Sequence, residues 1–200
     1  DILEEPFGDI SCIVIDNYMA VSGFRDSNVV PHGDPETFKM TVDSRWMDAV
    51  ITRFNIVRND GGHACQPVAH IVAGNMHTVC GTKAKATRPQ RRQALQLLRE
   101  KLETYNAPHP QMRLVRVIVG DDNLTTTEAR QALQRRTDAD PLWEVYPAVG
   151  ERQGDHVAVN GAAVTSIDIV DIAIGVSWRD RGMRVDDHDA VAVRLHVSVA

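Results

Sequence analysis

The stretch Arg113–Leu124, RLVRVIVGDDNL, joins a mostly apolar segment directly to a group of polar residues. Its apolar part, Leu114–Val119, is rich in β-branched residues, too short for a typical helix and too continuous for a half-exposed strand. We therefore expect a central strand that is buried on both faces. Gly120 allows the backbone to turn and places the polar residues at the carboxyl end of the strand, where sheet folds commonly hold ligand groups. These polar residues are Asp121, Asp122 and Asn123.

The same polar residues also have a purely structural interpretation. Asp and Asn side chains favour turns, and one of the threonines in Thr125–Thr127 could cap a helix over Ala129–Arg136 together with Glu128. Taken alone, a turn followed by a helix cap explains the cluster better than a catalytic site does. Polar residues at the ends of two other strand-like segments change this comparison.

The first of these segments lies upstream and the second near the end of the chain. Pro67–Val79 is expected to contain a strand that runs into the triplet Asn75–His77, and Asp186–His188 precedes the last strand. Between the first two strands, Gln90–Tyr105 carries leucines three and four residues apart, which predicts an amphipathic helix lying on the sheet. The chain is thus expected to form a strand-helix-strand unit with a polar cluster at the end of each strand.

The order of the three motifs, Asn-x-His, Gly-Asp-x-Asn and Asp-His-x-x-Val, resembles that of the endonuclease/exonuclease/phosphatase superfamily, which includes DNase I. The resemblance implies an α/β fold, namely a four-layer α/β/β/α sandwich of the DNase I-like type, shortened at its N-terminus. It covers most of Asp48–Val199, whereas residues 1–47 match only loosely. We expect a single domain over residues 1–200.

The resemblance also implies metal-dependent hydrolysis of a phosphodiester or phosphomonoester. His188 would act as the general base, with its tautomer fixed by Asp187 or by the more remote Asp168. Asp121 and Asn123 would respectively orient or deprotonate water and contact the phosphate.

His77 would stabilise the transition state in this implied site, and a divalent cation, Mg²⁺ or Mn²⁺, would neutralise charge. The metal-binding residues of the family are only partly matched in this sequence. An early strand of the family ends in a metal-binding glutamate, whereas the strand expected at Asp9–Tyr18 ends near Asp16. Because aspartate is one methylene shorter, Asp16 would reach the metal only after a backbone shift or through water. Asp187 is the second metal-binding candidate.

A second hypothesis keeps the fold without the catalysis. The missing glutamate, the short chain and the unmatched first strand favour a domain that lost its activity and serves as a structural or interaction subunit of a larger assembly. The retained Asp121, Asn123 and His188 oppose this hypothesis. A third class of function, a metal site, fits less well, because its candidate ligands lack a tight cysteine pair. These ligands are His63, Cys65, His77 and Cys80.

Composition limits the partners. The formal net charge of −5 argues against a general nucleic-acid binder. The segment Lys83–Lys101 nevertheless holds seven basic residues, which could face phosphate or form a solvated helix face. No apolar run approaches the ~20 residues that span a bilayer, so we expect a soluble protein. Three cysteines without paired spacing favour buried thiols in a reducing compartment.

Two expectations concern the first part of the chain. Because the sequence begins with Asp1 rather than Met, we expect it to start after processing or after unresolved residues. The segment Met19–Thr41 contains two glycines and two prolines and is therefore expected to be mainly loop.

Overall fold

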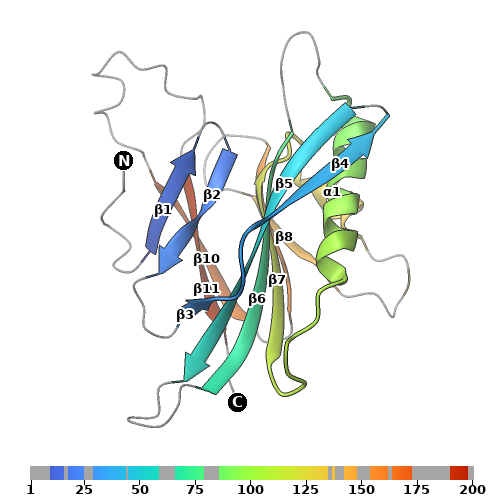
Figure 1. The fold of residues 1–200 in the computed structure, drawn as a ribbon. Helices are drawn as coiled ribbons and strands as arrows, with labels where there is room; N and C mark the ends of the chain where they lie inside the picture. Colours follow the sequence, from blue (N-terminus) through green and yellow to red (C-terminus); the bar gives the residue numbers. More distant parts are fainter. Residues whose placement is uncertain are drawn as a thin grey trace, which may run out of the picture.

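The computed structural model describes residues 10–15, 18–24, 29–43, 45–58, 66–78, 86–134, 137, 142–147, 154–161, 164–172 and 190–197. Within these ranges the chain forms a mixed α/β structure with one large sheet, two helices and two separate pairs of strands (Figure 1). No helix in these ranges is long and apolar enough to cross a membrane.

The large sheet contains seven strands. Its hydrogen-bonded order is β3-β5-β6-β7-β9-β8, and β4 pairs with β5. Strands β6 and β7 run parallel, whereas the other described pairs of this sheet are antiparallel. The strands are β3 (Val29–Pro31), β4 (Glu36–Val42), β5 (Arg45–Arg58), β6 (Gln66–His77), β7 (Arg113–Asp121), β8 (Glu144–Pro147) and β9 (Asp155–Asn160).

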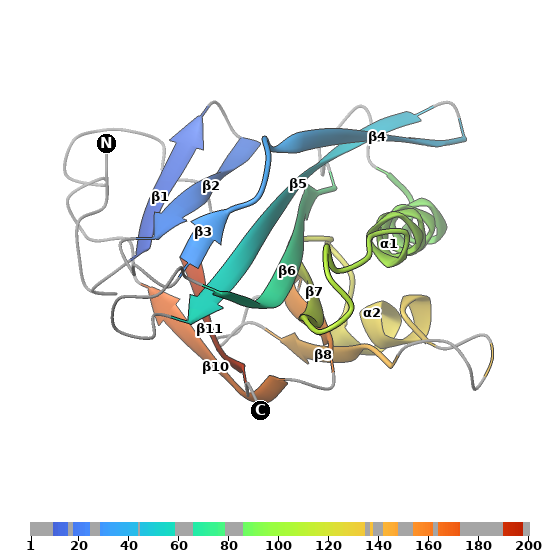
Figure 2. The same ribbon diagram turned by 60° about the horizontal axis from the view of Figure 1, so that its bottom comes forward.

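The helices and the strand pairs lie on opposite sides of the large sheet (Figure 2). One side carries α1 (Arg88–Glu103) and α2 (Thr126–Ala132). The other side carries two antiparallel pairs. These pairs are β1 (Ile10–Ile15) with β2 (Tyr18–Phe24), and β10 (Val164–Ile172) with β11 (Ala190–Val197). The described residues thus form one helical layer and one large sheet with strands beyond it, and the four-layer sandwich stays a prediction.

The expected strand-helix-strand unit is present as β6-α1-β7. The helix begins earlier than the expected Gln90–Tyr105 because the Thr87 side chain accepts a hydrogen bond from the Gln90 backbone N–H, while the Gln90 side chain bonds back to the Thr87 backbone. This reciprocal capping box fixes the start of the helix. Pro89 is tolerated in the first turn, where backbone N–H groups have no partner within the helix.

The central strand β7 is covered on both faces, as its sequence predicts. Ile118 packs in the core beneath the helices, together with α1 residues such as Leu98. Val115 and Val117 point the other way and form a second apolar cluster with two valines of β9. The strand therefore lies inside the large sheet, between β6 and β9, and is covered on both faces.

The expectation of a loop over most of Met19–Thr41 is wrong, because the structure has β2, β3 and β4 there. In β4 the exposed and buried residues alternate, and Met40 and Val42 are buried in the main core. Pairing with β5 over its whole length stabilises this strand. The prolines and glycines mark the breaks between strands rather than one long loop.

Candidate active site

The parallel register of β6 and β7 brings the first two polar clusters together. His77 lies opposite Asp121 at the carboxyl ends of the two strands. His77 Nε2 is 3.6 Å from Asp121 Oδ2, and the two side chains are 54% and 14% exposed, respectively. An accessible imidazole thus faces a carboxylate that is largely shielded from water.

Gly120 makes this arrangement possible. Its φ of 141° is rarely adopted by residues with a side chain, and a Cβ atom there would lie 1.9 Å from the backbone oxygen of Met76. Three positions later Asn123 has a φ of 53°, a left-handed conformation that Asn tolerates better than most residues. The chain therefore leaves β7 in a tight turn that favours Gly at position 120 and Asn at position 123.

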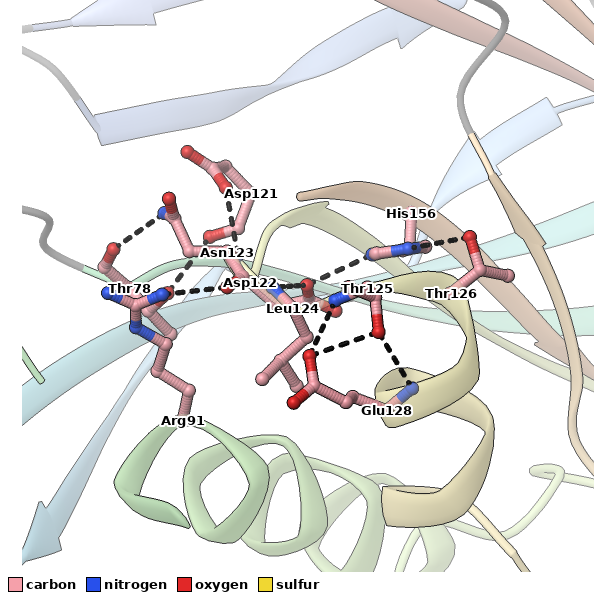
Figure 3. Close-up of polar contacts among 10 residues, drawn as sticks. All are labelled: Thr78, Arg91, Asp121, Asp122, Asn123, Leu124, Thr125, Thr126, Glu128 and His156. Carbon is pink, nitrogen blue, oxygen red and sulfur yellow. Dashed lines mark hydrogen bonds and ion pairs between the residues drawn. The ribbon is translucent and has the colours of Figure 1, made fainter. Parts of the chain in front are cut away.

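Hydrogen bonds from residues next to β6 and β9 hold the turn, and Figure 3 shows those with Thr78. The backbone N–H groups of Asp122 and Asn123 both donate to the Gly154 carbonyl, at 2.9 and 3.3 Å. Asn123 N–H also donates to Asp121 Oδ1 at 2.9 Å. On the other side, Thr78 N–H donates to the Asp121 carbonyl at 2.9 Å, and Asn123 Nδ2 donates to the Thr78 carbonyl at 3.0 Å. The ends of β6, β7 and β9 are thus joined around the turn.

Three arginines of the basic segment Lys83–Lys101 contact the turn after β7 or the helix α2 that follows it. Arg91 Nη1 donates to the Asn123 carbonyl at 2.7 Å, which links α1 to the turn. Arg88 and Arg92 approach the Glu128 carboxylate at 3.7 and 3.3 Å and link α1 to α2. These three arginines therefore contribute to the internal structure of the site region.

The helix cap expected after the turn is present as well. Thr125 Oγ1 accepts from Glu128 N–H at 3.3 Å, and Thr125 N–H donates to Glu128 Oε2 at 3.0 Å. This backbone hydrogen bond is the main reason why the pKa of Glu128 lies below its ordinary value. Because the cap starts at Thr125, α2 covers Thr126–Ala132 rather than the expected Ala129–Arg136. The turn and the helix cap are present together with the polar cluster of His77, Asp121 and Asn123. The residues can therefore form a turn and a cap and also contribute to a site.

A buried pair beneath the turn was not anticipated from the sequence. Asp122 and His156 are 3% and 6% exposed, and His156 Nδ1 lies 2.9 Å from Asp122 Oδ1. The same oxygen accepts from Leu124 N–H at 2.9 Å, and His156 Nε2 lies 3.3 Å from Thr126 Oγ1. Burial raises the pKa of Asp122, opposed by the hydrogen bond from His156. The available signal was a histidine that opens a continuous buried strand, Asp155–Asn160.

The structure does not place the other predicted site residues beside His77 and Asp121. Asp168 lies in β10, in register with Arg194 of β11 and in a different sheet from Asp121. Asp16, Asp187 and His188 lie outside the described residues. Their roles therefore stay predictions.

The metal sites expected from the sequence are likewise untested. Three ligands of the alternative site, His63, Cys65 and Cys80, lie outside the ranges that the structure describes. Within those ranges, no group of three or more His, Cys, Asp or Glu side chains is placed to hold a metal ion.

Comparison with known proteins found similarity to solved structures but no match in sequence. No protein-family model matches the chain, and no curated protein matches it in sequence. Among solved structures, the crystal structure of truncated Caenorhabditis elegans TDP2 is similar, with a TM-score of 0.47 and 13% sequence identity. The similarity covers 74% of this chain and 59% of the TDP2 chain, so this chain spans less than two thirds of that chain's length.

Proposed function

We propose that this chain is a divergent domain of the endonuclease/exonuclease/phosphatase type that hydrolyses a phosphodiester or phosphomonoester with a divalent metal ion. The observation that carries the proposal is the contact of His77 with Asp121 across the parallel strands, with Asn123 on the same turn. The motif order predicts that these three residues belong to one site.

The chemistry of phosphate-ester hydrolysis suits these groups. A carboxylate such as Asp121 can orient or deprotonate an attacking water, and its position at the end of a buried strand keeps it in place. His77 is exposed enough to meet a substrate and can donate a hydrogen bond to a phosphoryl oxygen. Asn123 adds an uncharged amide next to the same carboxylate, suited to contact a non-bridging oxygen.

A bound Mg²⁺ or Mn²⁺ ion would neutralise phosphate charge and lower the pKa of a coordinated water. The family resemblance assigns this ion to Asp16 and Asp187, neither of which is among the described residues. Metal dependence is therefore a part of the proposal that the assay below must establish.

The proposed sandwich has support from the valine-rich face of the large sheet. Val115, Val117, Val157 and Val159 are 0%, 4%, 1% and 4% exposed and lie on the face away from the helices. Such burial requires other parts of the chain to cover this face. The pairs β1-β2 and β10-β11 lie on that side (Figure 2), which favours their belonging to a second layer of strands.

Asp121→Asn tests the proposal directly. The substitution keeps the size of the side chain and an oxygen that can accept from Asn123 N–H, but removes the negative charge. We expect hydrolysis of bis(p-nitrophenyl) phosphate or p-nitrophenyl phosphate, measured with Mg²⁺ or Mn²⁺, to fall about a hundredfold or more. Asp34→Asn, at an exposed aspartate between β3 and β4, is the matched control and should keep full activity.

Equal activity of the Asp121→Asn and Asp34→Asn proteins would show that Asp121 takes no part in the reaction. A folded wild-type protein without turnover of either substrate would instead support the structural or interaction subunit.

A further inference from the structure

Asp122, His156 and Thr126 form a continuous polar chain inside the apolar core. The Asp122 carboxylate accepts hydrogen bonds from Leu124 N–H and His156 Nδ1–H, both at 2.9 Å. With Nδ1 as the donor, His156 Nε2 can accept from the Thr126 hydroxyl at 3.3 Å. This tautomer gives each of these groups a partner, as buried polar groups require.

Such a pair needs an explanation, because a carboxylate and an imidazole are unfavourable in an apolar interior compared with well-packed apolar side chains. The helix cap uses neither group, and within the turn Asp122 accepts from Leu124 N–H without the help of His156. The turn is already held by Gly120, by the Gly154 carbonyl and by the capping box of α2. The pair therefore adds something beyond the formation of the turn itself.

The order Thr-His-Asp also occurs in nucleophilic catalytic triads. The surroundings argue against this role. The cavity beside Asp122 and His156 has a volume of about 10 Å³ and is otherwise lined mainly by apolar side chains such as Met76 and Leu95. This volume suits about one water molecule, so a substrate cannot reach His156.

We infer that Asp122 and His156 are positioning residues that hold the turn between Asp121 and Leu124 in the orientation that directs Asp121 towards His77. His156 is anchored in β9, directly opposite Gly120 in the strand register. His156 contacts Asp122 from the side of Thr126, while Asp121 and Asn123 lie on the side of the turn away from His156 (Figure 3). The effect of the pair on catalysis by Asp121 rests on the proposed function, whereas its effect on the orientation of the turn does not depend on any activity.

The test replaces both members of the pair. Asp122→Leu/His156→Leu removes the polar pair without leaving either group buried alone, so the protein is expected to fold. Asn55→Leu/His70→Leu is the control: it removes a second polar pair, of buried His70 and half-buried Asn55, in which His70 Nδ1 lies 2.7 Å from Asn55 Oδ1, near the opposite end of β6.

The readout is the hydrogen exchange of the Thr78 and Asn123 backbone amides, relative to that of Val72 in the middle of β6. Neither amide bonds to Asp122 or His156, so a purely local loss would affect only Leu124 N–H. Positioning predicts that exchange at Thr78 and Asn123 rises about tenfold in Asp122→Leu/His156→Leu and stays unchanged in the control. Unchanged exchange at both amides would overturn the inference.

Activity provides the second readout. If the wild-type protein hydrolyses the phosphodiester, kcat should fall about tenfold or more in Asp122→Leu/His156→Leu, because the reacting groups lose their alignment. Faster exchange with an unchanged kcat would overturn the positioning role. If the wild-type protein has no activity, the proposed function fails, and the exchange data alone decide the inference.

A pair of single variants covers the case in which the double variant does not fold. His156→Asn places an amide nitrogen near the position of Nδ1 and can still donate to Asp122, whereas in His156→Gln the amide nitrogen lies nearer to Nε2. The inference predicts that His156→Asn keeps the slow exchange of Asn123 and that His156→Gln accelerates it. Equal exchange, or the reverse order, would contradict it.

Discussion

His70 is a buried histidine whose ionisation couples pH to stability. It is 2% exposed, lies in β6, and its Nδ1 is 2.7 Å from Asn55 Oδ1. Asn55 Nδ2 lies 3.3 Å from His32 Nδ1, and the two imidazole rings are 5.0 Å apart, edge to face. Burial, followed by repulsion from His32 and Arg53, lowers the pKa of His70 to about 4. The residue is therefore neutral in the folded protein at neutral pH.

This depressed pKa predicts loss of stability in mild acid. The unfolded chain takes up a proton near the ordinary pKa of about 6.5, whereas the folded chain does so only near 4. The free energy of unfolding should thus be fully retained above pH 6.5 and decrease as the pH falls towards 4, by about 2 kcal/mol between pH 7 and pH 5. Urea unfolding at both pH values should show a smaller decrease in His70→Gln. An equal decrease in both proteins would exclude His70 as its source.

The residues of the site differ in how far the sequence could predict them. Gly120 and Asn123 were recognised as turn formers, because their conformational preferences are local properties. The pairing of Asp122 with His156 joins the turn after β7 to β9, and the partner of Asp122 therefore depends on the strand order. Nothing in the local sequence distinguishes a buried aspartate in this turn from an exposed one. The contact therefore required the three-dimensional structure.

The start of α1 offers a prediction at the level of one element. Thr87→Ala would remove the side-chain oxygen that accepts from Gln90 N–H. We expect the free energy of unfolding to fall by about 1 kcal/mol, as for other helix caps. Gln93→Ala, at an exposed position within the same helix, should change it by less than about 0.5 kcal/mol in either direction. Chemical denaturation of the two variants measures the difference, and equal effects would show that the cap does not stabilise the folded protein.

Elements with a strong local pattern were predicted well. The leucine spacing of α1 and the β-branched run of β7 identified both elements and their connection, because each pattern reflects burial on one or both faces. Strand β4 was missed, since it is stabilised by pairing with β5 and by packing against α1 rather than by its composition. Such pairing between elements is not visible in a single segment of sequence.

At the scale of the whole molecule, the strand order explains how distant motifs meet. The crossover through α1 makes β6 and β7 parallel, so that His77 and Asp121 end at the same edge of the sheet. The antiparallel strand β9 begins at that edge. Gly154, directly before β9, and His156, within β9, contact the turn. The expected number of layers and the third motif, Asp187 with His188, depend on parts of the chain outside the described ranges.

The central claim is that all three motifs form one metal-dependent hydrolytic site. Its most direct test is the hydrolysis of bis(p-nitrophenyl) phosphate by the wild-type protein and by His188→Ala, with Mg²⁺ or Mn²⁺ and with a chelator. We predict turnover that the chelator abolishes and that His188→Ala reduces about a hundredfold or more, whereas His109→Ala, at an exposed histidine, keeps it. A folded wild-type protein without turnover in either metal, or with turnover that is insensitive to the chelator, would contradict the claim.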